Sequence, residues 1–151
     1  IDIAFLTGNI VEKLQHYAKE KCQTLEYEPV NSLPPFKGNS DRIEQVITNI
    51  ITNAIKYTPE AGTIKVYVGF VYNDAYIKII DTGIGIPEEE VNRIFERFYR
   101  ADPARDRKTG GSGLGLSIVK NAVKFHGGTV RVINRLEGGL QFFFSLRRQA
   151  D

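Results

Sequence analysis

Three separated polar segments of this sequence carry the residue types that a magnesium-bound nucleotide needs. They are Asn53 to Tyr57, Asp81 to Pro87 and Gly110 to Leu116. The first offers an amide ligand and a cation, the second an acceptor for a base, and the third backbone amides for phosphate. Each segment alone is a weak signal, whereas their order and spacing together favour one Mg²⁺-nucleotide site.

The Asn53 segment ends an amphipathic helical pattern. Gln45, Asn49 and Asn53 follow one another at intervals of four, so they fall on one line of the helix. Asn53, at the border of the apolar stripe, can offer its amide oxygen to Mg²⁺, which prefers oxygen ligands and shares its shell with phosphates. Lys56 can meet a phosphate as a point charge, and Tyr57 can pack against a base or ribose. The alternative is an ordinary amphipathic helix with solvated polar residues.

Asp81 follows an apolar run, so its carboxylate is carried to the edge of the core. An ionised carboxylate only accepts hydrogen bonds, which suits the exocyclic amine of adenine and opposes the guanine carbonyl. Gly83 and Gly85 permit tight backbone geometry and close approach of a ligand. The alternative is a structural turn in which Asp81 caps its own backbone.

The glycine run leads into a helical pattern that begins near Leu114. Amides at a helix N-terminus, together with the helix dipole, attract phosphate. The glycine spacing matches neither a P-loop nor a dinucleotide-binding fingerprint. The preceding segment, about 95–112, has a net positive charge and is predicted to be a lid with an arginine that steadies the transferring phosphoryl group. A solvated charged loop with a glycine hinge is the alternative.

The elements that position these residues follow from the hydrophobic periodicity. A helix–strand order with tight turns between strands predicts a mixed, largely antiparallel sheet, and single apolar helix faces place the helices on one side of it. The fold class is therefore an α/β (α+β) two-layer sandwich. The predicted helices are 3–21, 40–58, a short one after Pro87, and 114–125; the predicted strands are 23–30, 63–72, 75–80, 129–135 and 140–146.

Composition predicts a single domain over residues 1–151, because 42% of the residues are hydrophobic and 25% are charged. The net charge of +2 gives no argument for nucleic acid, and no apolar run approaches the roughly 20 residues of a bilayer span. Cys22 is the only cysteine, which excludes an internal disulfide. The chain begins without a methionine and is expected to be a piece of a longer protein.

Taken together, these segments resemble the ATP-binding catalytic domain of two-component sensor histidine kinases. The wider group includes gyrase-type, mismatch-repair and heat-shock chaperone ATPases, and the resemblance implies its Bergerat-type fold with a flexible ATP lid. Four motifs carry the likeness, and the F box favours histidine kinases within the group. They are an N box at 45–57, a first glycine box at 81–87, an F box at 94–100 and a second glycine box at 111–116.

The resemblance implies ATP and Mg²⁺ as cofactors and gives each matching residue a role. Asn53 would bind Mg²⁺, and the catalytic set would be Asn53, Lys56 and Arg100. The nucleotide-binding set would be Asn49, Tyr57, Asp81, Gly83, Gly85, Ile86, Tyr99, Gly111, Ser112, Gly113, Leu114, Gly115 and Leu116.

Two positions depart from the family pattern. Gly139-Leu140 stands where a glycine is often followed by a hydroxyl residue, so the hydroxyl contact near Asp81 is expected to be missing or replaced by apolar packing. Asn39 stands where the family often has aspartate, at a helix cap and away from the site.

The two histidines do not match a phosphoacceptor. His16 lacks the neighbouring acidic residue and downstream proline of an acceptor box, and His126 is expected to cap a helix end. The dimerisation and phosphoacceptor domain is thus expected to lie outside this chain, which would be monomeric and donate the γ-phosphoryl group to that domain's histidine. A response regulator would act downstream, with no nucleic acid or direct membrane contact. The resemblance further implies the cytoplasmic domain of a membrane-anchored bacterial sensor kinase.

Two other functions remain open from the residues alone. One is a nucleotide-controlled switch without kinase activity, in which ATP closes the lid and alters a partner surface. The other is an anti-sigma-type serine kinase that shares the same nucleotide site.

Overall fold

A computed structural model describes residues 1–30, 36, 38–71, 74–83, 115–135 and 138–147. Within these residues the predicted helices and strands are confirmed, with bounds that differ by one or two residues. The predicted helix after Pro87 and the predicted lid lie outside the described residues. The elements are α1 (Ile3–Glu20), β1 (Thr24–Pro29), α2 (Ser40–Tyr57), β2 (Thr63–Val71), β3 (Asp74–Asp81), α4 (Gly115–Phe125), β4 (Val130–Asn134) and β5 (Leu140–Arg147).

The five strands form one mixed sheet in the order β1-β2-β3-β5-β4. Only β1 and β2 pair in parallel, and the remaining neighbours are antiparallel. The central strand, β3, pairs with β2 up to Ile64 opposite Asp81, but its ladder with β5 ends one residue earlier, at Ile80 opposite Gln141. Asp81 therefore lies at the end of the central strand and just beyond its pairing with β5.

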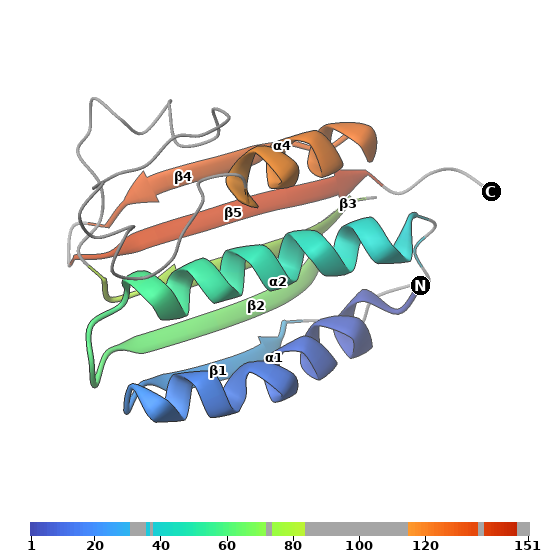
Figure 1. Ribbon diagram of the computed structural model, residues 1–151. Helices are drawn as coiled ribbons and strands as arrows, with labels where there is room; N and C mark the ends of the chain where they lie inside the picture. The colour runs from blue at the N-terminus through green and yellow to red at the C-terminus, as the bar shows by residue number, and fades with distance from the viewer. Residues whose placement is uncertain (31–35, 37, 72–73, 84–114, 136–137, 148–151) are drawn as a thin grey trace.

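The helices α1, α2 and α4 cover one face of the sheet, with α2 in the middle (Figure 1). This confirms the predicted two-layer α/β sandwich. Helix α2 begins where the Asn39 side chain accepts a hydrogen bond from the Arg42 amide at 3.1 Å, a normal N-cap. The prediction that Asn39 caps a helix is confirmed.

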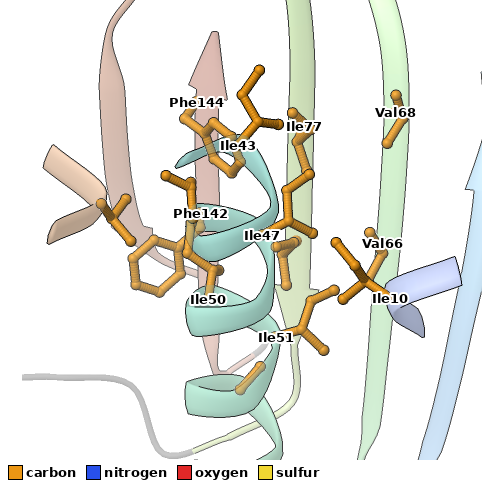
Figure 2. Close-up of a cluster of buried hydrophobic side chains, with 14 of the residues drawn as sticks. Ile10, Ile43, Ile47, Ile50, Ile51, Val66, Val68, Ile77, Phe142 and Phe144 are labelled. Carbon is orange, nitrogen blue, oxygen red and sulfur yellow. The ribbon is translucent and has the colours of Figure 1, made fainter. Parts of the chain in front are cut away.

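The core lies between α2 and the sheet (Figure 2). The isoleucines of α2 point toward β2, β3 and β5, as the periodicity predicts. Full burial of an aliphatic side chain of this size stabilises a fold by about 1.5–3 kcal/mol. The labelled residues, all less than a tenth exposed, are Ile10, Ile43, Ile47, Ile50, Ile51, Val66, Val68, Ile77, Phe142 and Phe144.

Two side chains from the α1–β1 connection hold the C-terminal end of α2. Lys21 Nζ donates to the carbonyls of Ile55, Lys56 and Thr58 at 2.8, 3.1 and 3.0 Å. Gln23 Nε2 donates to the Ile55 and Thr58 carbonyls at 2.9 and 2.7 Å. The last carbonyls of a helix have no partner within it, and a cation there also meets the negative end of the helix dipole. This clamp fixes the turn that carries two predicted site residues.

Helices α2 and α4 run antiparallel, which sets where their ends lie (Figure 1). At one end, His126 Nδ1 lies 2.8 Å from the Ala122 carbonyl, and the Asn39 amide donates to His126 Nε2 at 3.0 Å. His126 is buried there and joins the end of α4 to the start of α2. Its predicted structural role is confirmed. At the other end, the start of α4 points toward the same side of the fold as the end of α2 and the end of β3 (Figure 1).

Candidate functional site

The N-box residues lie on the second half of α2. Asn49, Asn53, Lys56 and Tyr57 are all half-buried, which is the border position predicted for Asn53. Lys56 Nζ lies 5.5 Å from the centre of the Tyr57 ring, a cation–π distance. An amide oxygen at such a border is a hard ligand, so Asn53 fits the donor chemistry of Mg²⁺, whose remaining ligands are commonly waters and phosphates.

Asp81 is only 6% exposed, although it is an acid at the end of a strand. Its Oδ1 accepts hydrogen bonds from the Gly83 amide at 2.8 Å and from the Leu140 amide at 3.1 Å. The first bond is the turn cap proposed above as the structural alternative, and it coexists with the second, long-range bond. Both bonds from the described residues go to the same oxygen.

Burial raises the pKa of the Asp81 carboxyl above the ordinary aspartate value. The hydrogen bonds from the Gly83 and Leu140 amides and the positive charge of Arg135 oppose that increase. Desolvation by itself favours the neutral acid, whereas these three groups stabilise the charged carboxylate. A buried carboxylate with this support is well suited to accept a hydrogen bond from a ligand amine.

The turn after Asp81 lies against the end of α2. A side chain at Gly83 would place its Cβ 3.0 Å from the Tyr57 carbonyl oxygen and 2.9 Å from Asp81 Oδ1, so there is little room for one. Thr82 ties the same turn to β2, because its Oγ1 accepts from the Thr63 amide at 2.9 Å. The first two of the three predicted segments therefore meet at one place.

The β4–β5 turn closes the site on the other side of Asp81. Arg135 Nη1 donates to the Asp81 carbonyl at 2.9 Å. Gly139 has φ +85, and a Cβ there would collide with the same carbonyl oxygen. The position therefore requires glycine for both conformation and space. Sequence reasoning missed Arg135 and the clamp residues Lys21 and Gln23. The glycine pair Gly138-Gly139 marks the turn beside Arg135, whereas no comparable signal stands beside Lys21 or Gln23.

Leu140 stands where the family often has a hydroxyl residue, and the structure shows what replaces the hydroxyl contact. The residue reaches Asp81 through its backbone amide, so this contact needs no side-chain hydroxyl. The Leu140 side chain is half-buried and packs against the core cluster. Apolar packing, one of the two outcomes expected from the sequence, is therefore present together with a backbone hydrogen bond to the acid.

The second glycine box is described only where it enters the helix. Gly115 and Leu116 are the first residues of α4, whose start lies toward the same end of the fold as the ends of α2 and β3 (Figure 1). Those ends are Tyr57 and Asp81. The predicted helix start at Leu114 is thus placed within one residue. The other predicted site residues lie outside the described residues: Gly85, Ile86, Tyr99, Arg100, Gly111, Ser112, Gly113 and Leu114.

Among the helices of the described residues, none is long and apolar enough to cross a membrane.

Comparison with known proteins shows the family to which this chain belongs. The family model described as "Histidine kinase-, DNA gyrase B-, and HSP90-like ATPase" matches residues 38–150. The sensor protein kinase WalK of Staphylococcus aureus is 46% identical over 149 residues, which cover 97% of this chain and 35% of WalK. The chain spans about a third or less of the length of the curated relatives that it matches.

Solved structures show the same fold. The catalytic domain of histidine kinase ThkA has a TM-score of 0.86 and 27% identity, covering 98% of this chain and 93% of that one. Full-length ShkA in complex with AMPPNP has a TM-score of 0.85 and 29% identity, covering 100% of this chain and 31% of that one. ThkA in complex with the response regulator TrrA has a TM-score of 0.82 and 26% identity, covering 99% and 41%.

Proposed function

Because this chain belongs to the family of histidine kinase-, DNA gyrase B-, and HSP90-like ATPases, we propose that it binds Mg-ATP and supplies the γ-phosphoryl group to a histidine of a separate phosphoacceptor domain. Its relatives support the kinase branch of the family, because the curated relatives are sensor kinases and the match to WalK of Staphylococcus aureus covers almost the whole chain. The terminal P–O bond of ATP breaks, a P–N bond to the acceptor imidazole forms, ADP leaves, and the imidazole releases its N–H proton to solvent or to a base beside the acceptor histidine.

The observation that carries this proposal is the environment of Asp81. Its buried carboxylate is held through Oδ1 by two backbone amides, which orients Oδ2 as the acceptor for the adenine amine. Guanine has a carbonyl at the equivalent place, and two acceptors facing each other in a buried site are unfavourable. The site therefore selects ATP over GTP.

The other residues act at the phosphate end. Tyr57 packs beside the nucleotide, Lys56 places a positive charge near the phosphates, and Asn49 assists. The Asn53 amide oxygen would hold Mg²⁺, which neutralises phosphate charge when it is bound. The first amides of α4, at Gly115 and Leu116, face developing negative charge with the favourable end of the helix dipole.

The remaining roles rest on the family resemblance together with the relatives' names. Arg100, Tyr99 and the lid about 95–112 would close over ATP, with Gly85, Ile86, Gly111, Ser112, Gly113 and Leu114 lining the nucleotide. The acceptor histidine belongs to a dimerisation domain outside this chain, and a response regulator takes the phosphoryl group onward, as the complex of ThkA with TrrA suggests. The chain by itself is monomeric and acts in the cytoplasm as part of a membrane-anchored sensor kinase.

Calorimetric titration with ATP and GTP, with and without Mg²⁺, tests the binding half of this proposal. We expect adenine-selective binding that Mg²⁺ strengthens. Asp81→Asn replaces an acceptor by an amide donor and removes a charge-assisted hydrogen bond of about 1.5–3 kcal/mol, so ATP affinity should fall about ten- to a hundredfold. Asp74→Asn, at the opposite end of the same strand, is the matched control and should leave affinity unchanged. Equal binding of ATP and GTP by the unaltered chain would reject the proposed site.

Mixing the chain with a separately produced phosphoacceptor domain and γ-labelled ATP tests the transfer half. Acid-labile label on histidine supports the proposal. Label on serine would indicate the anti-sigma-type kinase instead, and ATP binding without transfer would indicate the nucleotide-controlled switch.

A further inference from the structure

We propose that Arg135 is a positioning residue for adenine recognition, which fixes Asp81 from the β4–β5 turn. The inference rests on the proposed function, because it concerns the same ATP site. It adds a residue that none of the family motifs identified in the sequence contains, 54 positions away from the acid that it holds.

The position of Asp81 in the sheet creates the need for such a residue. The β3–β5 ladder ends at Ile80 opposite Gln141, so Asp81 has no paired residue on β5. Its carbonyl on that side receives the Arg135 Nη1 hydrogen bond at 2.9 Å instead. The guanidinium of Arg135 thus holds the main chain of β3 at Asp81, one residue beyond the last backbone pair with β5.

The turn itself holds Arg135 in place. The Arg135 amide donates to the Gly139 carbonyl at 2.9 Å, and the Gly138 amide donates to the Arg135 carbonyl at 3.1 Å. The next residue, Leu140, donates its amide to Asp81 Oδ1. One short turn therefore contacts both the main chain and the carboxylate of Asp81, and a shift of the turn would move both contacts together.

Arg135 also acts through its charge. Burial raises the pKa of Asp81, and the Arg135 cation opposes that rise by stabilising the carboxylate. Within the described part of the chain, Arg135 is the charged side chain that acts on this group. Only the ionised acid is a pure acceptor, so losing the charge should make adenine recognition fail at a higher pH.

Two substitutions separate geometry from charge. Arg135→Lys keeps the cation but loses the planar fork of donors, whereas Arg135→Gln loses the charge and keeps a shorter donor. ATP affinity of the 151-residue chain is measured for both by titration at a series of pH values from neutral downward. Thermal unfolding at each pH confirms that the protein is folded, and Arg135→Met serves as a second neutral variant if the glutamine variant is unstable.

We expect Arg135→Gln to weaken ATP binding about five- to tenfold at neutral pH, less than Asp81→Asn, because Arg135 affects ATP only through the position and charge of Asp81. We call the low-pH range in which ATP affinity is lost the acid limb. The acid limb of Arg135→Gln should lie at higher pH than that of the unaltered chain. Arg135→Lys should keep the acid limb of the unaltered chain. Asp81→Asn should flatten the limb, which assigns it to Asp81, and Arg131→Gln, an exposed arginine on β4, should change neither property.

Three results would overturn the role of Arg135. An acid limb of Arg135→Gln that coincides with that of the unaltered chain would reduce the residue to a structural one. An equal shift in Arg131→Gln would assign the effect to net surface charge. Failure of the unaltered chain to bind ATP would reject the proposed function itself. That result differs from one in which ATP binds and the acid limbs of Arg135→Gln and the unaltered chain coincide.

Discussion

The two ends of the antiparallel helix pair α2 and α4 are built in different ways. At one end, both ring nitrogens of His126 have protein partners, the Ala122 carbonyl and the Asn39 amide. At the other end, the hydrogen bonds that described residues give to the buried acid Asp81 go to one oxygen, Oδ1. Both groups are buried and polar, yet among the described residues only the histidine has partners for both of its polar side-chain atoms.

Under the proposed function, this difference separates a structural polar residue, His126, from a ligand-binding one, Asp81. A buried polar group without a partner is costly, so most buried polar groups are hydrogen-bonded within the protein or to water. At the Asp81 end, the hydrogen bonds of the described residues hold the acid and the neighbouring backbone in position. Two amides hold the carboxylate, the Arg135 guanidinium holds the Asp81 carbonyl, and the Lys21–Gln23 clamp holds the end of α2. Substitutions at the two ends should therefore separate stability from binding.

The largest expected effect on stability is at the His126 end. His126→Ala removes a buried ring and leaves the Asn39 amide without its acceptor, which should lower the free energy of unfolding by about 2–4 kcal/mol. Urea denaturation measures this, with His16→Ala, an exposed histidine on α1, as the control. Under conditions where the variant is folded, its preference for ATP over GTP should be unchanged. Loss of that preference would show that the two ends are not independent.

The next largest effect on stability is expected at Gly139, which is compared with its neighbour Gly138 because both have positive φ. Gly138→Ala meets nothing within 4 Å, so it should cost only the backbone strain, about 1 kcal/mol. Gly139→Ala would also collide with the Asp81 carbonyl and displace it. We expect Gly139→Ala to lose about 2 kcal/mol more stability than Gly138→Ala, and also ATP affinity. Equal effects in denaturation and titration would mean that the contact with Asp81 carries no weight.

A smaller effect is expected from the clamp on α2. Lys21→Met keeps the apolar stem but removes the donors to three carbonyls, which should cost about 1–2 kcal/mol of stability. Because the clamped turn carries Lys56 and Tyr57, ATP affinity should also fall, by about two- to threefold.

Lys19→Met, an exposed lysine in the last turn of α1, is the control for the clamp. Hydrogen exchange should show faster opening at the end of α2 in Lys21→Met only. Unchanged exchange there would argue that α2 is fixed by its core packing alone.

The smallest effect is on the pH dependence of stability. The pKa of Asp81 is raised in the folded protein, so the folded state binds its proton more tightly than the unfolded state. Stability should therefore decrease as pH rises from the ordinary aspartate pKa through the raised folded value. Asp81→Asn lacks this component, and its urea midpoint should decline less over that range. Parallel curves for the two proteins would contradict the assigned direction of the shift.

Much of the fold could be predicted because its signals are local. The i, i+3, i+4 pattern from Ile43 to Ile55 indicates α2 without reference to any other residue, and Asn39 marks its start. Asp81 at the end of an apolar strand and Gly83 after it indicate a turn with an acceptor at the edge of the core. These features arise from periodicity and capping, which involve residues a few positions apart.

The sequence by itself therefore determined the elements, the two-layer arrangement and the acid expected to read the base. Only the tertiary structure decided how that acid is held. Leu140 reaches it through a backbone amide, which every non-proline residue has, so no side-chain type announces the contact. Arg135 and Lys21 look like ordinary surface cations in the sequence, and they reach main-chain carbonyls 54 and 34 to 37 residues away. Contacts of this kind depend on strand register and on where turns fold back, and those are set by the packing of the whole chain.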